Sequence, residues 1–82
     1  MNISLDISYY PLNREHIPPI LDFIERIKSH HDLLVRTNGL STQVFGDFDK
    51  VMDTVKDEIH KSFEIPNSVF VVKIVNVDQS AF

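Results

Sequence analysis

The feature that most constrains the fold of this chain is a hydrophobic period that changes along the sequence. Residues 3–10 alternate in side-chain character at every step, which predicts a strand with one buried face. From about Ile17 the apolar residues recur at helical spacing, and Pro18 and Pro19 suit the first turn of a helix, with His16 or Asn13 as its cap. The apolar positions of this predicted helix are Ile17, Ile20, Leu21, Ile24 and Ile27.

The middle of the chain carries the signature of a hairpin. Asn38 and Gly39 separate two β-prone runs, at 33–37 and 40–45, which predicts a two-residue type I′ turn with positive φ at both residues. We expect Gly46 to end the second strand and Asp47 to cap a second helix. The apolar positions of that helix are Phe48, Val51, Met52, Val55, Ile59 and Phe63. After a break at Pro66 and Asn67, the β-branched run 69–77 predicts a last strand.

The predicted order is strand, helix, strand, strand, helix, strand. The two crossover helices take the same hand and therefore cover the same face of one antiparallel sheet. We expect the α+β ferredoxin-like sandwich, with its four strands in the order 4-1-3-2. Since 82 residues leave no room for a second domain, residues 1–82 are expected to form a single domain of this type.

Composition excludes several classes of function. The net charge of −4 argues against a nucleic-acid binder, and no apolar run is long enough to span a membrane. The first residues alternate and include Asp6, unlike a signal peptide, so we expect a cytoplasmic protein. The absence of cysteine excludes disulfides and thiolate zinc sites. A chain this short builds only a small core, which favours self-association.

The sequence shows no sign of an enzyme. Its two glycines form no phosphate-binding loop, and no serine or threonine stands in a nucleophile motif. His30, His31 and Asp32 are adjacent, so on a helix end they point in different directions, and we expect them to serve the helix C-terminus rather than a metal. We therefore expect no catalytic residue, no metal site and no cofactor.

The face of the sheet that the helices leave uncovered is the candidate functional surface. If Ile3, Leu5 and Ile7 face the helices, Ser4, Asp6, Ser8 and Tyr10 face the other way. On the third strand, burial of Leu40, Thr42 and Val44 would expose Ser41, Gln43 and Phe45, although the opposite assignment is open. The last strand would add Val71, Lys73 and Val75. Such a mixed surface suits sheet-to-sheet pairing or a shallow pocket, and its polar groups are otherwise simply solvated.

Three segments resemble the YkoF-like thiamine/hydroxymethylpyrimidine-binding family: residues 7–12 (ISYYPL), 37–49 (TNGLSTQVFGDFD) and 69–74 (VFVVKI). The resemblance spans nearly the whole chain, and the central segment is its most specific part. It implies a ferredoxin-like unit in a cytoplasmic, non-catalytic homo-oligomer, a dimer or tetramer whose sheets pair between subunits. It also implies that thiamine or its pyrimidine moiety is a ligand, with no chemistry performed on it.

Thiamine joins an aminopyrimidine, which needs hydrogen-bond donors and acceptors, to a cationic thiazolium, which favours a carboxylate or an aromatic face. On the resemblance, the candidate ligand-binding residues are Asp6, Ser8, Tyr10, Asn38, Ser41, Thr42, Gln43 and Asp47, with Tyr9 as a further aromatic ring. Asn38 also has a turn-forming role, and Thr42 a place in the core. The candidate oligomer interface is Phe45, Val71, Lys73 and Val75. The alternative is an interaction protein whose open face serves subunit assembly alone.

Overall fold

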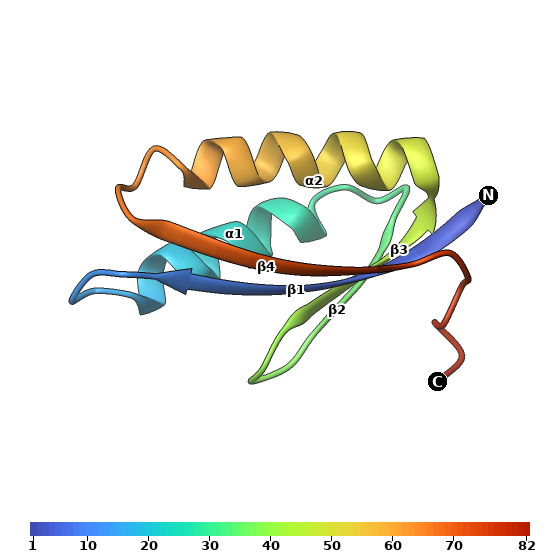
Figure 1. The fold of residues 1–82 in the computed structure, drawn as a ribbon, viewed down its shortest axis with the longest axis horizontal. Helices are drawn as coiled ribbons and strands as arrows, with labels where there is room; N and C mark the ends of the chain where they lie inside the picture. The colour runs from blue at the N-terminus through green and yellow to red at the C-terminus, as the bar shows by residue number, and fades with distance from the viewer.

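A computed structural model describes residues 1–82 and contains one four-stranded antiparallel sheet, in the order β2-β3-β1-β4, and two helices (Figure 1). The predicted ferredoxin-like fold is therefore confirmed, since 4-1-3-2 is the same order counted from the other edge. The elements are β1 (Asn2–Pro11), α1 (Ile17–Lys28), β2 (Leu34–Thr37), β3 (Thr42–Asp47), α2 (Phe48–Ser62) and β4 (Ser68–Val75). Neither helix combines the length and the apolar character that crossing a membrane requires.

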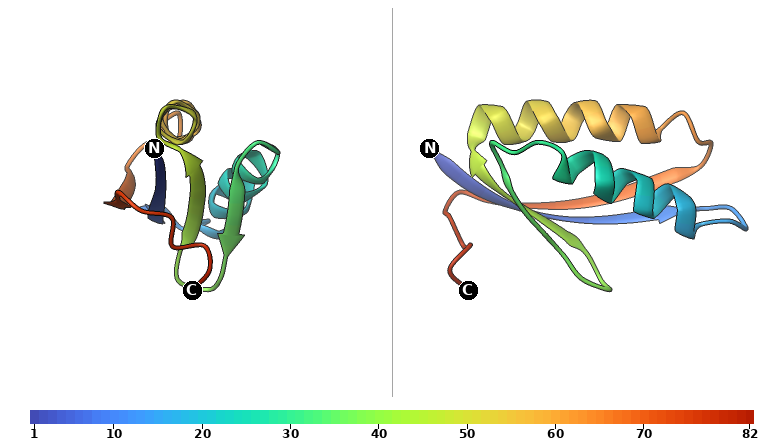
Figure 2. Two further views of the ribbon diagram at one scale, coloured as in Figure 1. Left: turned by 90° about the vertical axis from the view of Figure 1, so that its right-hand side faces the viewer. Right: turned by 180° about the vertical axis from the view of Figure 1, so that it is seen from behind.

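Both helices lie on one side of the sheet, and the core fills the space between (Figures 1 and 2). The alternation in β1 decides which side chains enter this space, because every second residue of a strand points the same way. The buried core residues are Ile3, Leu5, Ile7, Tyr9, Phe23, Ile27, Leu33, Val44, Val51 and Val55. The ring of Tyr9 stacks on that of Phe70, with 4.2 Å between the ring centroids.

The phase of both helices differs from the prediction. In α1, Ile17 and Leu21 are exposed, whereas Phe23, which was not predicted to face the sheet, is 1% exposed. The first-turn prolines are confirmed, but the side chain of the N-cap residue His16 makes no capping hydrogen bond. In α2, Val51 and Val55 are buried as predicted. Phe48 and Phe63 are 43% and 55% exposed, because the helix turns Glu58 and Ser62 inward instead.

The hairpin has a longer connection than predicted. Positive φ occurs at neither Asn38 nor Gly39, so the type I′ assignment is wrong. The Thr37–Thr42 pair closes a four-residue loop, residues 38–41, in which Asn38 Oδ1 accepts hydrogen bonds from the backbone N–H groups of Leu40 (2.8 Å) and Ser41 (3.1 Å). Asn38 is therefore the turn former through its side chain. Leu40 was expected in the core but is 88% exposed at the tip of this loop.

Gly46 does not end β3 but lies within it, paired with Ile3. A Cβ at this position would lie 2.8 Å from Leu33 Cδ2 and 3.3 Å from Val51 Cγ2. Glycine therefore allows a close approach here, because a larger residue would force the side chains of Leu33 and Val51 to shift. The predicted cap of α2 is confirmed, because Asp47 Oδ2 accepts a hydrogen bond from the N–H of Lys50 at 3.4 Å.

A buried ion-pair network, which we call the helix clamp, joins α1 to α2. Glu58 is 3% exposed, and it accepts hydrogen bonds from Arg26 Nη1 (2.6 Å) and contacts His30 Nε2 (2.8 Å). Arg26 also donates to Ser62 Oγ at 2.7 Å. Burial alone would raise the pKa of Glu58, but the hydrogen bonds from His30 and Arg26, helped by the charge of Lys61, outweigh it and lower that pKa.

His30 thus belongs to this contact between the helices. Its partner Glu58 comes from α2, a feature that the local sequence around residues 30–32 does not reveal.

Candidate functional site

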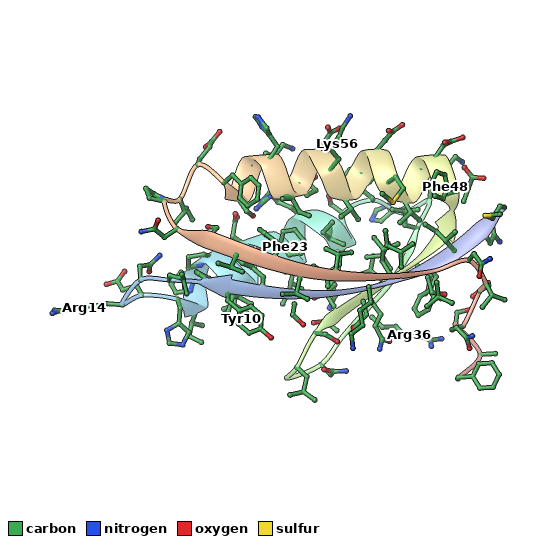
Figure 3. All side chains as sticks on the ribbon, in the orientation of Figure 1. Tyr10, Arg14, Phe23, Arg36, Phe48 and Lys56 are labelled. Carbon is green, nitrogen blue, oxygen red and sulfur yellow. The ribbon has the colours of Figure 1, made fainter.

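Strand register decides which side chains share the face of the sheet opposite to the helices, here called the open face. Asp6 stands between Gln43 on β3 and Lys73 on β4, and Ser4 stands between Phe45 and Val75. Ser8 is paired with Val71 on the same face. Figure 3 shows Tyr10 and Arg36 on the side of the sheet away from α2, and Phe23 between the sheet and the helices. The sides assigned to these strand residues from alternation are therefore those observed, whereas Leu40 and Ser41 lie in the loop before β3.

Residues 76–82, here called the strap, fold back over one end of the open face (Figure 1). Ser4 Oγ donates a hydrogen bond to the carbonyl of Val77 (2.7 Å) and accepts one from the N–H of Gln79 (2.8 Å). The guanidinium of Arg36 lies 5.5 Å from the ring centroid of Phe45. Phe45 is consequently only 6% exposed, although it lies outside the helix-side core. The expectation of a wholly uncovered face thus needs correction at this end.

Asp78, on the strap, is fully exposed and acidic. Hydrogen bonds from the side chain and the backbone N–H of Ser80 lower its pKa, and the nearby positive charge of Arg36 acts in the same direction. The strap therefore holds an anion on the same side of the molecule as the Arg36 cation.

A hollow, here called the hairpin pocket, opens where β3 parts from β1. The pairing of β1 with β3 stops at Ile7 and Thr42, whereas the pairing of β1 with β4 continues to Pro11. The last residues of β1 therefore have no strand partner on the β3 side. The gap of about 220 Å³ lies between β1, α1 and the hairpin loop. Its lining residues are Ile7, Tyr9, Tyr10, Ile20, Phe23, Ile24 and residues 37–42.

The hairpin pocket combines aromatic rings with neutral polar groups. Thr37 and Thr42 share a hydrogen bond of 3.3 Å between their hydroxyls, and Asn38 Oδ1 is engaged within the loop. The amide NH₂ of Asn38 and the hydroxyl of Ser41 make no hydrogen bond within the chain, so both can serve a ligand. Tyr9 Oη is bound to Ser68 Oγ at 3.1 Å. No charged side chain lines this pocket.

The other pocket, here called the strap pocket, lies on the open face beneath the strap and has a volume of about 260 Å³. Asp6 Oδ1 is buried here and has no hydrogen-bond partner. Such an orphaned acceptor is unusual in a folded protein. The lining residues are Ser4, Leu5, Asp6, Gln43, Phe45, Lys73, Val75, Gln79 and Phe82.

The structure thus divides the predicted ligand-binding residues between two places. Tyr10, Asn38, Ser41 and Thr42 line the hairpin pocket, whereas Asp6 and Gln43 line the strap pocket. Ser8 lines neither pocket, and Asp47 caps α2. Of the predicted interface residues, Phe45, Lys73 and Val75 line the strap pocket, and Val71 is 49% exposed on the open face.

Sequence reasoning missed the contribution of α1 to the hairpin pocket and that of Gln79 to the strap pocket. Ile20, Phe23 and Ile24 are contributed by α1. The helical spacing of apolar residues was a signal for Ile20 and Ile24, but nothing local marks Gln79 as a neighbour of Ser4. No group of three or more histidine, cysteine or acidic side chains is placed to hold a metal ion.

No protein-family model matches the chain, and no curated protein is similar to it in sequence. Solved structures are similar in fold. A protein of Streptococcus pneumoniae superposes with a TM-score of 0.87 at 21% identity, over 100% of this chain and 93% of the other. A Thermotoga maritima protein, provisionally described as a thiamine biosynthesis/salvage protein, gives 0.84 at 21% identity, over 94% and 85% of the two chains.

A hypothetical protein of Methanocaldococcus jannascii gives a TM-score of 0.80 at 23% identity, over 95% of this chain and 82% of the other. At these identities the likenesses establish a shared fold.

Proposed function

We propose that this chain is a non-catalytic cytoplasmic protein that binds thiamine or its hydroxymethylpyrimidine moiety in the hairpin pocket. One observation carries the proposal: the free amide of Asn38 and the hydroxyl of Ser41 line one pocket with the half-exposed ring of Tyr10 and the largely buried rings of Tyr9 and Phe23. An aminopyrimidine needs this combination of a flat apolar surface and hydrogen-bonding groups at its edge. The thiamine-related description of the Thermotoga maritima protein of the same fold supports the proposal.

The size of the pocket favours one ring of thiamine over the whole molecule. A pocket for a complete drug-sized ligand usually measures about 300–1,000 Å³. The hairpin pocket, at about 220 Å³, accommodates the pyrimidine and leaves the thiazolium at its mouth. There the half-exposed ring of Tyr10 offers a face to the thiazolium cation.

The same geometry changes the residues expected to contact the thiazolium cation of thiamine. Asp6 and Asp47 were candidates for that role, but neither lines the hairpin pocket. We therefore assign the cation to aromatic contact alone. Such a contact is worth about 0.5–1 kcal/mol at an exposed site. Thiamine is consequently expected to bind only a few times more tightly than hydroxymethylpyrimidine.

Isothermal titration with thiamine, hydroxymethylpyrimidine and thiamine phosphates tests the proposal. Ser41→Ala is expected to weaken both thiamine and hydroxymethylpyrimidine roughly five- to tenfold, the usual worth of one hydrogen bond. Tyr10→Leu should weaken thiamine alone, because the free pyrimidine has no cation for the ring to face.

Ser8→Ala is the matched control, since Ser8 lies on the same strand as Tyr10 but lines neither pocket. The absence of both heat and thermal shift with every ligand at millimolar concentration would refute the proposal.

The second candidate function is assembly through the open face. Tyr10, Val71 and Val75 are 52%, 49% and 41% exposed there, and Leu34 adds a further 46% exposed side chain. Exposed apolar side chains gathered on one face are characteristic of protein interfaces. This candidate is compatible with ligand binding in a homo-oligomer, and as the sole function it predicts an assembly without a ligand.

A further inference from the structure

We propose that the strap pocket is a second ligand site, separate from the hairpin pocket, and that it takes a small zwitterion of the amino-acid class. The carrying observation is the buried oxygen of Asp6 that the folded chain leaves without a partner. A buried acceptor without a donor is costly, and neither Gln43 nor Lys73, the two residues paired with Asp6, donates to this oxygen in the structure. The geometry therefore points to a donor on a bound molecule.

The donor is not Lys73, although the strand register places that residue directly opposite Asp6. The ion pairs of the structure involve Asp47, Asp22 and Glu58, and Lys73 takes part in none of them. One carboxylate and one ammonium are therefore cross-strand neighbours in the strap pocket, and no ion pair joins them or involves either one elsewhere. Cross-strand neighbours of this kind lie about 5 Å apart at their Cβ atoms.

This pair selects the charge of the ligand. A simple amine would donate to Asp6 but would be repelled by the ammonium of Lys73. A simple carboxylate would pair with Lys73 but would be repelled by Asp6. A metal cation is disfavoured, because it would meet the ammonium of Lys73 and because Asp6 is the only side chain of the lining that carries a carboxylate. A molecule with an ammonium beside a carboxylate satisfies both side chains at once, and its net charge of zero matches that of the pair.

The remaining lining residues suggest an apolar side chain on the ligand. The apolar lining residues are Leu5, Phe45, Val75 and Phe82, and Gln43 and Gln79 add amide groups to the lining. The strap supplies Gln79 and Phe82, and its backbone is held to Ser4 by hydrogen bonds of 2.7 and 2.8 Å. A ligand between the sheet and the strap would therefore contact both. Its binding is expected to shift the NMR signal of the Gln79 N–H group.

L-Leucine is the first probe, and its binding is measured in amide NMR spectra of the isotope-labelled chain. We expect millimolar or tighter binding with shifts centred on Ser4, Gln43 and Gln79. N-Acetyl-L-leucine lacks the ammonium and L-leucinamide lacks the carboxylate, so each should bind at least roughly tenfold more weakly. Equal binding of these three compounds, or no shift at millimolar L-leucine, would overturn the proposal.

Two variants of the chain complete the test. Asp6→Asn and Lys73→Met should each weaken L-leucine at least roughly tenfold, because each removes one charge contact. Ser8→Ala, on the same face but outside the pocket, should bind as the unaltered chain does. Thermal unfolding of each variant checks that the fold is retained. Unchanged affinity in Asp6→Asn would sink the proposal even if L-leucine bound.

The proposals for the two pockets can be refuted independently of each other. Asp6→Asn should leave thiamine binding unchanged, because Asp6 does not line the hairpin pocket. Ser41→Ala should likewise leave L-leucine binding unchanged. If Asp6→Asn abolished thiamine binding, the strap pocket would be the thiamine site and the amino-acid proposal would be lost.

Discussion

The side chain of Gly46 is a single hydrogen atom, and its small size lets the segment before β2 pack closely against the start of α2. Any larger side chain there meets Leu33 at 2.8 Å and Val51 at 3.3 Å. Both contacted residues are buried, so neither can move without disturbing the core. Gly46 therefore shows a residue whose identity is set by packing, since its backbone conformation is open to any amino acid.

Gly46→Ala is expected to lower the free energy of unfolding by about 1–2 kcal/mol, the usual cost of overpacking a core. Urea denaturation measures the change. Gly39→Ala is the matched control, because no atom lies within 4 Å of its added methyl group and its φ is not positive. We expect Gly39→Ala to change stability by no more than about 0.5–1 kcal/mol, and in the stabilising direction. Equal destabilisation by both changes would contradict this account.

Single residues also show how far the sequence could be interpreted. The Asp47 cap and the turn-forming role of Asn38 follow from side-chain chemistry that acts within three residues, and both are observed. The burial of Phe23 and Glu58 depends on the rotation of a helix against its neighbours. Local spacing leaves that rotation open when a helix carries two adjacent apolar stripes. In α1, one stripe is Ile17, Leu21 and Ile24, and the other is Ile20, Phe23 and Ile27.

At the scale of elements, the helix clamp makes the pairing of α1 with α2 depend on one ionised carboxylate. The pKa of Glu58 is lower in the folded chain than its ordinary value of 4.5, because the hydrogen bonds from His30 and Arg26 outweigh burial. A lowered pKa means that the ionised form stabilises the fold. This contribution is complete above the ordinary value and is lost as the pH falls through the folded value.

Glu58→Gln is expected to lower the free energy of unfolding at neutral pH by about 1.5–3 kcal/mol, the worth of hydrogen bonds to a charged group. As the pH falls below the ordinary value of 4.5, the difference between Glu58→Gln and the unaltered chain should shrink, and it should be lost once Glu58 is protonated in the folded chain. Chemical denaturation across the acid range measures both effects. Glu25→Gln, at an exposed position on α1, serves as the control. A constant difference at every pH would show that the charge of Glu58 does not stabilise the clamp.

The hairpin is the element that the sequence predicted in kind but not in detail. The Asn38–Gly39 pair correctly marked the connection, yet the same two residues also fit a longer loop closed by the Asn38 side chain. The choice between the two decides where β3 begins and whether Leu40 is buried. It is the longer loop that places Ser41 and Asn38 at the edge of the hairpin pocket.

For the whole molecule, the order in which strand-like and helix-like hydrophobic patterns follow one another was enough to predict the topology, because the handedness of crossovers leaves few alternatives. The strap was not predictable, since residues 76–82 carry no periodic pattern and their contact with Ser4 joins positions more than 70 residues apart. The division of the candidate ligand residues into two pockets was hidden for the same reason. Alternation tells which face a residue occupies but not where on that face a hollow forms.

Self-association belongs to this scale. Val71→Asp places a charge in the exposed apolar part of the open face and is expected to weaken any sheet-to-sheet assembly by at least roughly tenfold in dissociation constant. Sedimentation velocity over a range of protein concentrations measures the effect. Gln43→Ala, in the strap pocket, should change the assembly little. If Val71→Asp leaves an observed assembly intact, the open face is not its interface.

The loop closed by Asn38 has a kinetic consequence. Its two hydrogen bonds to the backbone hold residues 38–41 in place in the absence of any other molecule. A compound that reaches this edge of the hairpin pocket therefore binds to a loop that is already in its final conformation. Arrival rates should then be similar for all compounds of comparable size, and preference among them should be expressed in how long each one stays.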